Sequence, residues 1–381
     1  MALNPFTPAF GGRPQHFFGR EREIGIVEEA LDNEFSPHRA LFVTGNRGFG
    51  KTALLEQASR VASSKRWLTF DVHSSHASTA ILKQVVGGDS KTVERSLEPS
   101  ALGISLGKAS SSTTSVFEPS DRSDALLEKC RSLTLHDGIF ISIDEAQKIP
   151  EEDMENVCAA VQISMRKGYP VMIMLAGLPG AKEKVSAYPG CTFMQRAEDL
   201  QISSLLVDET VATFSSLLKA IPEIDVSDEG IWEISEFSQG QPYLMQLVGY
   251  YLVELLQERR PVSGIGEEGL LDAAKRQTLA AYRTNVLKPA FSTLGKGLQA
   301  YLSAAARLLD PDGRASTGAI AKELGKSAQQ CSSYRERLIK HRYLIDDGWG
   351  YVSFGLPHTV DYFLRDDEPP SPRDPRGWTI S

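Results

Sequence analysis

The sequence predicts an α/β fold, in which a mostly parallel β-sheet carries helices on both faces and is followed by a helical segment and a small terminal domain. Three observations lead to this fold class. Short apolar runs alternate with segments of helical periodicity over residues 18–205, which is the pattern of a parallel sheet with crossover helices. Residues 208–286 are helical almost throughout, and residues 291–365 combine helical segments with a hairpin.

The predicted strands are short runs rich in apolar and β-branched residues. They lie at 41–44, 66–73, 139–143 and 170–180, with a further strand after Arg196. Helical periodicity marks the segments at 17–33, 53–64, 124–133 and 154–168. Residues 74–120 are rich in Ser, Thr and Gly and predict a long insertion with one short helix near 79–86. This insertion is either a spacer or a partner-binding surface.

A glycine-rich loop joins the first strand to the next helix and fits the pattern GxxxxGK[ST]. Its residues are Gly45, Asn46, Arg47, Gly48, Phe49, Gly50, Lys51 and Thr52. Backbone N–H groups can wrap a polyphosphate only in conformations that glycine adopts cheaply. Lys51 can reach the β- and γ-phosphates, the Thr52 hydroxyl can ligate magnesium, and the following helix points its positive end at the anion. Strand, loop and helix together predict a nucleoside triphosphate site rather than a chance glycine-rich turn.

Two carboxylates, Asp144 and Glu145, end the predicted strand at 139–143. A carboxylate pair at the end of a buried strand is costly unless it has a cationic or metal partner. Magnesium bound to the nucleotide at a neighbouring strand end is such a partner. We expect Asp144 to hold the metal and Glu145 to orient and deprotonate the attacking water. The alternative, a strand end in a solvated turn, is common for a lone Asp-Glu pair.

Composition and charge limit the class of protein. Of 381 residues, 41% are apolar and 24% are charged, as in ordinary globular proteins. The net charge of −8 argues against a protein coated with basic residues, although a local basic face is compatible with it. The four cysteines form no CxxC pair, which indicates a reducing compartment. The sequence shows no secretory signal and no membrane-spanning apolar run, so we expect a cytoplasmic protein without a membrane partner.

The second half of the chain predicts two helical units. Helices are expected at 208–220, 227–238, 243–257 and 270–286. In the break Gly240-Gln241-Pro242, glycine ends one helix and proline helps to start the next. After residue 291, three helices precede a hairpin around Asp347-Gly348, which is the pattern of a winged-helix domain.

The predicted recognition helix of this winged-helix domain runs from Ser327 to Lys340. Its exposed candidates for DNA contact are Gln329, Gln330, Ser332, Ser333, Arg335 and Arg337. Residues 290–365 hold ten Lys and Arg against seven Asp and Glu, a net of +3 in an acidic chain, which favours phosphate contact. Asp346 and Asp347 at the wing tip would repel DNA, and a winged helix can also pack on its own core or bind a protein.

The predicted organisation has three folded parts and a tail. A core at 1–206 contains the insertion at 74–120, an α-helical lid covers 207–288, a winged-helix domain covers 289–365, and 366–381 form a disordered tail.

These motifs resemble the AAA+-type P-loop ATPases, closest to the bacterial and archaeal branch with a C-terminal winged helix that includes initiator-like and signal-transduction ATPases. The resemblance covers about the first 260 residues. It implies that Gly19 and Arg20, in the segment FFGRERE, cover the adenine, that Pro242 contacts the nucleotide, and that Arg196 serves as an arginine finger toward a neighbouring subunit. From the residues alone, Gly19 and Arg20 also fit a plain helix start, and Arg196 a surface arginine.

The sequence departs from this family at two places. The family's sensor position after the fourth strand usually carries Asn, Ser or Thr, whereas this chain has Ala176 and Gly177. The lid often supplies an arginine, whereas here the turn reads Gly-Gln-Pro-Tyr. The resemblance therefore implies an ATP- and Mg²⁺-dependent ATPase with slow turnover, which forms a homo-oligomer in the ATP state. Its winged helix, through residues 317–353, would couple the nucleotide state to double-stranded DNA; the alternative is a signalling ATP/ADP switch or nucleotide-locked scaffold whose winged helix binds protein.

Overall fold

The computed structural model describes residues 3–9, 16–72, 137–221, 225–257 and 267–364. Within these residues, five strands form one sheet in the order β2-β3-β4-β1-β5, and all neighbours are parallel. The strands are β1 (Ala40–Thr44), β2 (Trp67–Val72), β3 (Gly138–Ile143), β4 (Val171–Gly177) and β5 (Glu198–Gln201). Because parallel strands share one carboxyl edge, the chain leaves β1, β3 and β4 at the same edge, with β4 between the other two.

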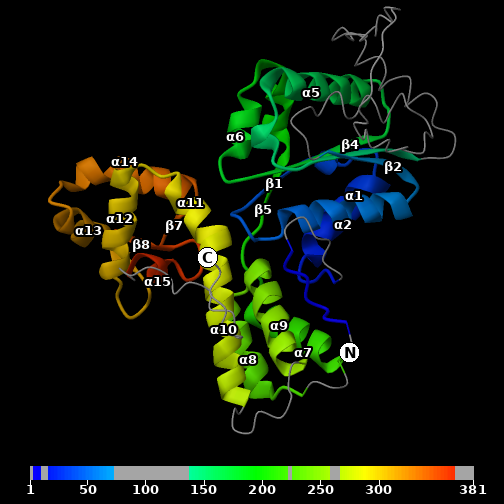
Figure 1. Cartoon of the computed structure of the whole chain (residues 1–381). Helices are drawn as coiled ribbons and strands as arrows, with labels where there is room; N and C mark the ends of the chain where they lie inside the picture. The colour runs from blue at the N-terminus through cyan, green and yellow to red at the C-terminus, as the bar shows by residue number, and fades with distance from the viewer. Residues whose placement is uncertain (1–2, 10–15, 73–136, 222–224, 258–266, 365–381) are drawn as a thin grey trace, which may run out of the picture.

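Helices cover both faces of this sheet, which confirms the predicted α/β fold class (Figure 1). One face carries α1 (Glu21–Asp32) and α2 (Lys51–Ser64), and the other carries α5 (Glu151–Arg166) and α6 (Ala181–Ser186). Short helical turns η1 (Pro37–Arg39), η2 (Ala146–Lys148) and η3 (Pro189–Arg196) precede β1, follow β3 and precede β5.

The side chains of the central strands alternate between two hydrophobic cores. Val43 and Met174 lie in the core that contains the buried residues of α1 and α2. Phe42 and Leu175 lie in the core that contains those of α5 and α6. Burial on both faces explains why β3 and β4 are continuous apolar runs in the sequence rather than alternating ones.

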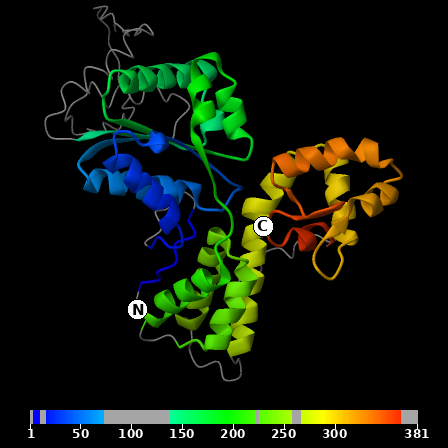
Figure 2. The same cartoon turned by 180° about the vertical axis from the view of Figure 1, so that it is seen from behind.

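A bundle of four helices follows the sheet within the described residues. Its members are α7 (Val207–Lys219), α8 (Asp228–Ser238), α9 (Pro242–Gln257) and α10 (Glu267–Tyr282), and each lies where the sequence predicts a helix. Phe214, Ile234 and Leu252 are buried in a core of this bundle. Helical backbone continues beyond α10 through a π-helical turn, η4 (Arg283–Leu287), into α11 (Lys288–Ser292). The result is a long rod that leads from the bundle to the C-terminal elements (Figure 2).

Residues 3–9 lack regular structure, but they pack on this bundle. The Phe6 side chain is 2% exposed, and its ring centroid lies 5.8 Å from that of Phe214. Asn4 Nδ2 donates to the carbonyl of Tyr250 at 3.2 Å. A Cβ atom at Gly249 would lie 2.4 Å from the Phe6 ring, so this glycine makes room for the phenylalanine. No pattern in the sequence predicts these contacts.

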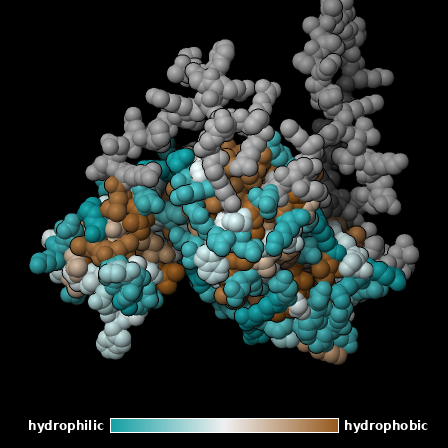
Figure 3. Space-filling view, turned by 90° about the horizontal axis from the view of Figure 1, so that it is seen from below, coloured by the Kyte–Doolittle hydropathy of each residue, from teal (hydrophilic) through white to brown (hydrophobic). Residues whose placement is uncertain are grey.

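The C-terminal domain, residues 288–364, combines helices with an antiparallel sheet in the order β6-β8-β7. After α11, its elements are α12 (Lys296–Arg307), β6 (Ala315–Ser316), α13 (Thr317–Glu323), α14 (Ala328–Lys340), β7 (Leu344–Asp346), β8 (Tyr351–Phe354) and α15 (Thr359–Leu364). The three predicted helices and the predicted hairpin are all present, while β6 and α15 were not predicted. Seen from below, this domain forms a separate lobe (Figure 3).

Several predictions fall outside the described residues. These are the insertion at 74–120, the helices near 79–86 and at 124–133, and the tail at 366–381. Across the described ranges, no helix is both long enough and apolar enough to cross a membrane.

Candidate functional site

The glycine-rich loop turns sharply between β1 and α2. Gly48 and Gly50 have φ values of +84° and +87°, a region that other residues rarely adopt. Gly50 is the N-cap residue of α2, which begins at Lys51. The loop therefore lies at the N-terminus of a helix of 14 residues, where free backbone N–H groups and the helix dipole favour an anion.

Lys51 is held inside this loop. Its side chain is buried, and Nζ donates to the carbonyl oxygens of Gly45 and Asn46, both at 2.9 Å. Burial lowers the pKa of the Lys51 ammonium to about 8, although the nearby Glu145 and Asp144 carboxylates act in the opposite direction. A buried ammonium with only carbonyl partners is well suited to receive a phosphate, because a charged partner restores the stability of its protonated form.

Asp144 and Thr52 meet across the carboxyl edge of the sheet. Asp144 follows β3 and is 8% exposed, and its Oδ2 accepts the Thr52 hydroxyl at 2.5 Å. Its other oxygen, Oδ1, accepts the backbone N–H of Glu145 at 2.7 Å. A hydroxyl and a carboxylate are the oxygen ligands that Mg²⁺ uses when substrate phosphates and water complete its shell. Among the described residues, no group of three or more His, Cys, Asp and Glu could hold a metal by protein ligands alone.

Glu145 adopts an unusual backbone conformation beside this pair. Its φ of 50° and ψ of 41° place it in the left-handed region, which is uncommon for a residue with a side chain and frequent at functional sites. The Glu145 carboxylate accepts Gln147 Nε2 at 2.8 Å and pairs with Lys148 Nζ at 3.0 Å, both through Oε2.

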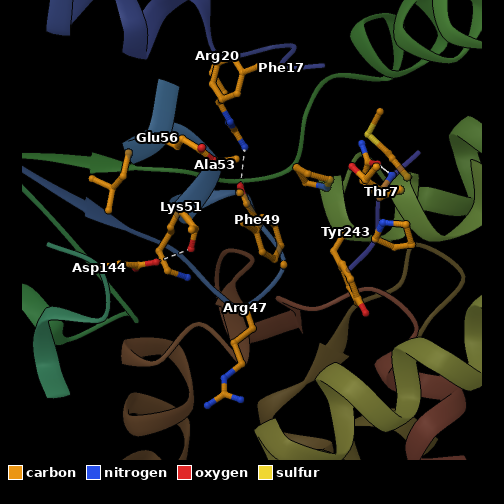
Figure 4. A pocket seen from close by; sticks show the side chains of 18 of the residues that line it. Thr7, Phe17, Arg20, Arg47, Phe49, Lys51, Ala53, Glu56, Asp144 and Tyr243 are labelled. Carbon is orange, nitrogen blue, oxygen red and sulfur yellow. Dashed lines mark hydrogen bonds between the residues drawn. The ribbon is translucent and has the colours of Figure 1, made fainter. Parts of the chain in front are cut away.

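These residues line one cavity of about 780 Å³. The loop supplies Arg47 to Thr52, and the strand ends supply Asp71, Asp144 and Glu145. Figure 4 shows Lys51 beside Asp144, with Thr7 and Tyr243 on another side of the cavity. The N-terminal segment contributes Thr7, Pro8, Ala9, His16, Phe17 and Phe18, and the helical bundle and η4 contribute Pro242, Tyr243, Met245, Gln246 and Asn285. Phosphate-binding features at one end and mostly neutral side chains at the other suit a nucleotide.

Most of the cavity-lining residues that lie outside the sheet were not predicted from the sequence. Only Pro242 and the segment around Arg20 were predicted there. Tyr243 lies next to Pro242 and its hydroxyl accepts from Asn285 Nδ2 at 3.2 Å. Gln246 Oε1 accepts the backbone N–H of Thr7 at 2.7 Å, which ties the N-terminal segment to α9. These pairs are separated by 42 and 239 positions, so no local pattern announces them.

Gly19 and Arg20 directly precede α1. The Arg20 side chain is hydrogen-bonded to backbone carbonyls of the protein. Arg20 is 8% exposed and donates through Nη2 to the carbonyl of Ser203 at 2.5 Å and, more weakly, to that of Phe49 at 3.4 Å. Gly19 has a φ of 70° and packs against Leu205. Arg20 lines the cavity and at the same time braces the phosphate loop.

Two residues of the loop have surroundings that differ from those of Lys51. Asn46 is 8% exposed, and its Nδ2 donates to the carbonyl of Arg342 at 2.7 Å and reaches that of Gly355 at 3.5 Å, both in the C-terminal domain. Arg47 is exposed, and its side chain extends away from Lys51 (Figure 4). The glycine-rich pattern predicts that both residues bind the nucleotide, and the structure shows an additional partner for Asn46.

Arg196 lies apart from the cavity. It is the last residue of η3, just before β5, it is exposed, and it is not among the lining residues. Its predicted role as a finger toward a second subunit stays a prediction.

The predicted DNA-contacting residues lie on α14, but three of them have side-chain partners within the domain. The Ser332 hydroxyl donates to the carbonyl of Gln329 at 2.9 Å. Gln329, Gln330, Ser333 and Arg337 are exposed. Gln330 Oε1 accepts the backbone N–H of Ser327 at 2.9 Å and so caps the helix. Arg335 pairs with Asp346 of β7 at 3.0 Å. The capping role follows from the spacing Ser-x-x-Gln, a signal that was present in the sequence.

Comparisons with known proteins agree with this geometry. Residues 16–174 match the family described as the AAA ATPase domain, and residues 284–363 match a family described only as a domain of unknown function. No curated protein matches the chain. Residues 16–174 are thus similar to an AAA ATPase domain, and the parallel sheet that they contribute to has a P-loop fold.

Solved structures resemble almost the whole chain. The Walker-type ATPase PABY2304 of Pyrococcus abyssi has a TM-score of 0.62 at 15% identity, over 92% of this chain and 97% of that chain. The ORC2 protein of Aeropyrum pernix, in its ADPNP–ADP complexes, has a TM-score of 0.63 at 13% identity, over 93% of this chain and 96% of that chain. Likeness at such low identity establishes the fold that this chain shares with them.

Proposed function

We propose that this protein is an ATP- and magnesium-binding ATPase that turns over slowly and couples its nucleotide state to the C-terminal domain. The observation that carries the proposal is the meeting of Lys51, Thr52, Asp144 and Glu145 at one end of a nucleotide-sized cavity. These side chains come from α2 and from the end of β3, and together they supply the charges that phosphoryl transfer requires.

Each residue has a separate part in this proposal. The loop N–H groups and the Lys51 ammonium bind the phosphates. The phosphate oxygens then replace the carbonyl oxygens of Gly45 and Asn46 as partners of Lys51. Thr52 and Asp144 fit as the protein ligands of Mg²⁺, which would neutralise charge on the transferring phosphoryl group. Glu145 accepts the proton of the attacking water, because one of its oxygens, Oε1, has no hydrogen bond to another described residue.

Slow turnover is supported by the bundle side of the cavity, because the described lining residues from the bundle helices and η4 include no cation. The bundle helices and η4 line it with Pro242, Tyr243, Met245, Gln246 and Asn285, none of which is a cation. A cation at the γ-phosphate accelerates this chemistry strongly. Arg196 is the proposed source of such a cation from a neighbouring copy, so hydrolysis by a single copy should be slow.

The C-terminal domain is proposed to be a winged helix that binds double-stranded DNA. Its order, α12, β6, α13, α14 and the β7–β8 hairpin, supports this assignment, and α14 presents Gln329, Ser333 and Arg337 to solvent. The local excess of positive charge in residues 290–365 supports phosphate contact.

Contacts between this domain and the ATPase core support coupling. Besides the Asn46 contact with the Arg342 carbonyl, the Arg342 guanidinium bonds to Gln201 Oε1 at the end of β5. His341 Nδ1 lies 3.3 Å from the carbonyl of Pro179, beyond β4. The phosphate loop and two strand ends thus touch a single segment, residues 341–342, that directly follows α14. A shift of the loop on nucleotide binding would reach α14 through these contacts.

A second candidate function is favoured by the wing tip. Trp349 is 101% exposed and Ile345 is 51% exposed, and the turn between them carries Asp346 and Asp347. Apolar side chains with acidic neighbours suit a protein partner better than a DNA backbone. In this alternative the nucleotide switches a protein contact.

The test is phosphate release from ATP with and without linear double-stranded DNA of mixed sequence, beside Lys51→Ala as the inactive control. We expect slow release that DNA stimulates about fivefold or more, as for a typical coupling between sites. The double variant His341→Ala/Arg342→Ala removes side-chain contacts with the core without touching the cavity. We expect it to keep the basal rate and lose most of the stimulation.

Two results would contradict parts of this proposal. The first result is a rate of phosphate release that DNA does not change, together with DNA binding that is lost at moderate salt. This result would favour the alternative in which the C-terminal domain binds a protein. Absence of any release above the Lys51→Ala background would remove the ATPase assignment.

The Lys51 pKa predicts a pH dependence for ATP affinity. The free protein loses the Lys51 proton near pH 8, whereas the phosphate-bound form needs it, so binding must take up a proton above that pH. We expect affinity to be nearly constant below pH 7 and to fall about 10-fold between pH 7 and pH 9. Calorimetry in two buffers of different ionisation enthalpy should show close to one proton taken up at pH 9. The arginine of Lys51→Arg stays charged at pH 7 and at pH 9, so this variant should bind ATP with the same affinity at both. If its affinity falls with pH as in the wild type, Lys51 is not the group that takes up the proton.

A further inference from the structure

Gln147 connects the residues that follow two strands, β3 and β4, beside the candidate site. It lies in η2, two residues beyond Glu145, and its side chain is half-buried. Its Nε2 donates to Glu145 Oε2 at 2.8 Å, and its Oε1 accepts the backbone N–H of Leu178 at 3.3 Å. Leu178 directly follows β4, the strand between β1 and β3. One amide therefore joins the candidate water-activating carboxylate to the middle strand of the sheet.

The chain leaves room for this amide at the end of β4. A Cβ atom at Gly177 would lie 2.6 Å from Gln147 Oε1 and 2.4 Å from the Cβ of Ala181. No side chain can extend from residue 177 without displacing Gln147, so Gln147 supplies the polar group at this strand end. The backbone of Gln147 is also held, because its carbonyl accepts Lys184 Nζ from α6 at 2.7 Å.

The two partners fix the orientation of the amide. The Leu178 N–H can only donate and thus requires Oε1, which turns Nε2 toward Glu145. Among the described residues, the Glu145 carboxylate has one other partner in the site, Lys148, whose side chain is 65% exposed. An exposed ion pair is screened by solvent and holds its partners loosely. Gln147 is therefore the more rigid of the two contacts. Both contacts use Oε2, and Glu145 lines the cavity.

We propose that Gln147 is a positioning residue for hydrolysis, which holds the Glu145 carboxylate in the orientation that activates water. This inference rests on the proposed ATPase function. Glu145 has a strained backbone, and its side chain would otherwise turn freely between the cavity and Lys148. A general base acts only when it lies within hydrogen-bond reach of the proton that it takes, and a displacement of about 1 Å can cost roughly 100-fold in rate.

The test compares Gln147→Met and Gln147→Ala with the wild type. Methionine keeps the length of the side chain and removes both hydrogen bonds, while alanine also empties the space beside Gly177. Gln162→Met, on α5 and away from the cavity, is the matched control. The measurements are kcat for phosphate release, the Kd of the non-hydrolysable analogue ADPNP, and the unfolding temperature, which shows whether each variant is folded.

We expect kcat to fall about 10- to 100-fold in both Gln147 variants, with the Kd of ADPNP within about twofold of the wild type because Gln147 touches no part of the phosphate loop. Gln162→Met should match the wild type in every measurement. An unchanged or increased kcat in folded Gln147→Met would overturn the inference, as would a Kd weakened by the same factor as kcat. A wild type that releases no phosphate above the Lys51→Ala background would instead remove the ATPase function itself, and this inference with it.

Discussion

Replacing Glu145 by Gln is expected to reduce phosphate release by about 100-fold or more, since general bases contribute roughly 10²- to 10⁴-fold. Glutamine has nearly the same size and can still accept from Gln147, but it cannot take the proton of the attacking water. Affinity for ATP should stay within about twofold, because the phosphate loop, Lys51 and the Thr52–Asp144 pair are unaltered. Single-turnover release and a separate binding titration measure the two effects.

Glu151→Gln is the control for the lost charge. Glu151 lies in the first turn of α5, is exposed, and is not among the residues that line the cavity. It should leave the rate unchanged. If Glu145→Gln hydrolyses ATP like the wild type, the base is a different group and Asp144 becomes the candidate. If the wild type binds ATP tightly but never hydrolyses it, the nucleotide only locks the bundle against the core.

The sequence was sufficient for the fold and for the phosphate end of the site. The loop Gly45 to Thr52 and the pair Asp144-Glu145 are local patterns, each read from one strand and the residues that follow it. Parallel pairing then brings these strand ends to one edge, and the structure has them there. Strands buried on both faces, and helices with caps such as Ser327, leave equally local signals.

The other end of the cavity could not be predicted, because its contacts join distant parts of the chain. Asn4 and Thr7 bond to α9 across more than two hundred positions, in a segment without periodicity. Asn46 reaches Arg342 across 296 positions, although its place in the loop assigns it to the nucleotide. The family resemblance implied that Ala176 and Gly177 lack the polar side chain usual at this position. It could not indicate that the Gln147 amide lies beside Gly177.

The junction between α8 and α9 shows what the sequence could predict and what it could not. Gly240 was predicted to end a helix, and it does so between α8 and α9. Its second role depends on a distant partner: the carbonyl of Gly240 accepts the backbone N–H of Leu205 at 2.8 Å. Leu205 follows β5, so this hydrogen bond joins the sheet to the bundle and sets the position of Pro242 and Tyr243 in the cavity.

Replacing Gly240 by Ala is therefore expected to destabilise the protein by about 4 kcal/mol, near the upper end of single substitutions. Gly240 has a φ of +66°, and a Cβ atom there would lie 2.1 Å from the carbonyl oxygen of Leu205. The backbone conformation alone costs alanine about 1–2 kcal/mol. The rest comes from the clash, because the opposing atom belongs to the backbone of Leu205, whose N–H donates to Gly240, and it cannot rotate away as a side chain would.

Gly168→Ala separates these two contributions. Gly168 has a φ of +78°, close to that of Gly240, but nothing lies within 4 Å of a Cβ placed there. It should lose only about 1–2 kcal/mol for its backbone conformation. Urea unfolding measures both free energies, with equal slopes indicating comparable unfolded states. Equal losses in the two variants would mean that the Leu205–Gly240 contact opens at little cost and that sheet and bundle are joined elsewhere. A larger loss in Gly240→Ala, with weaker ATP binding, would place the junction of the two parts at this glycine.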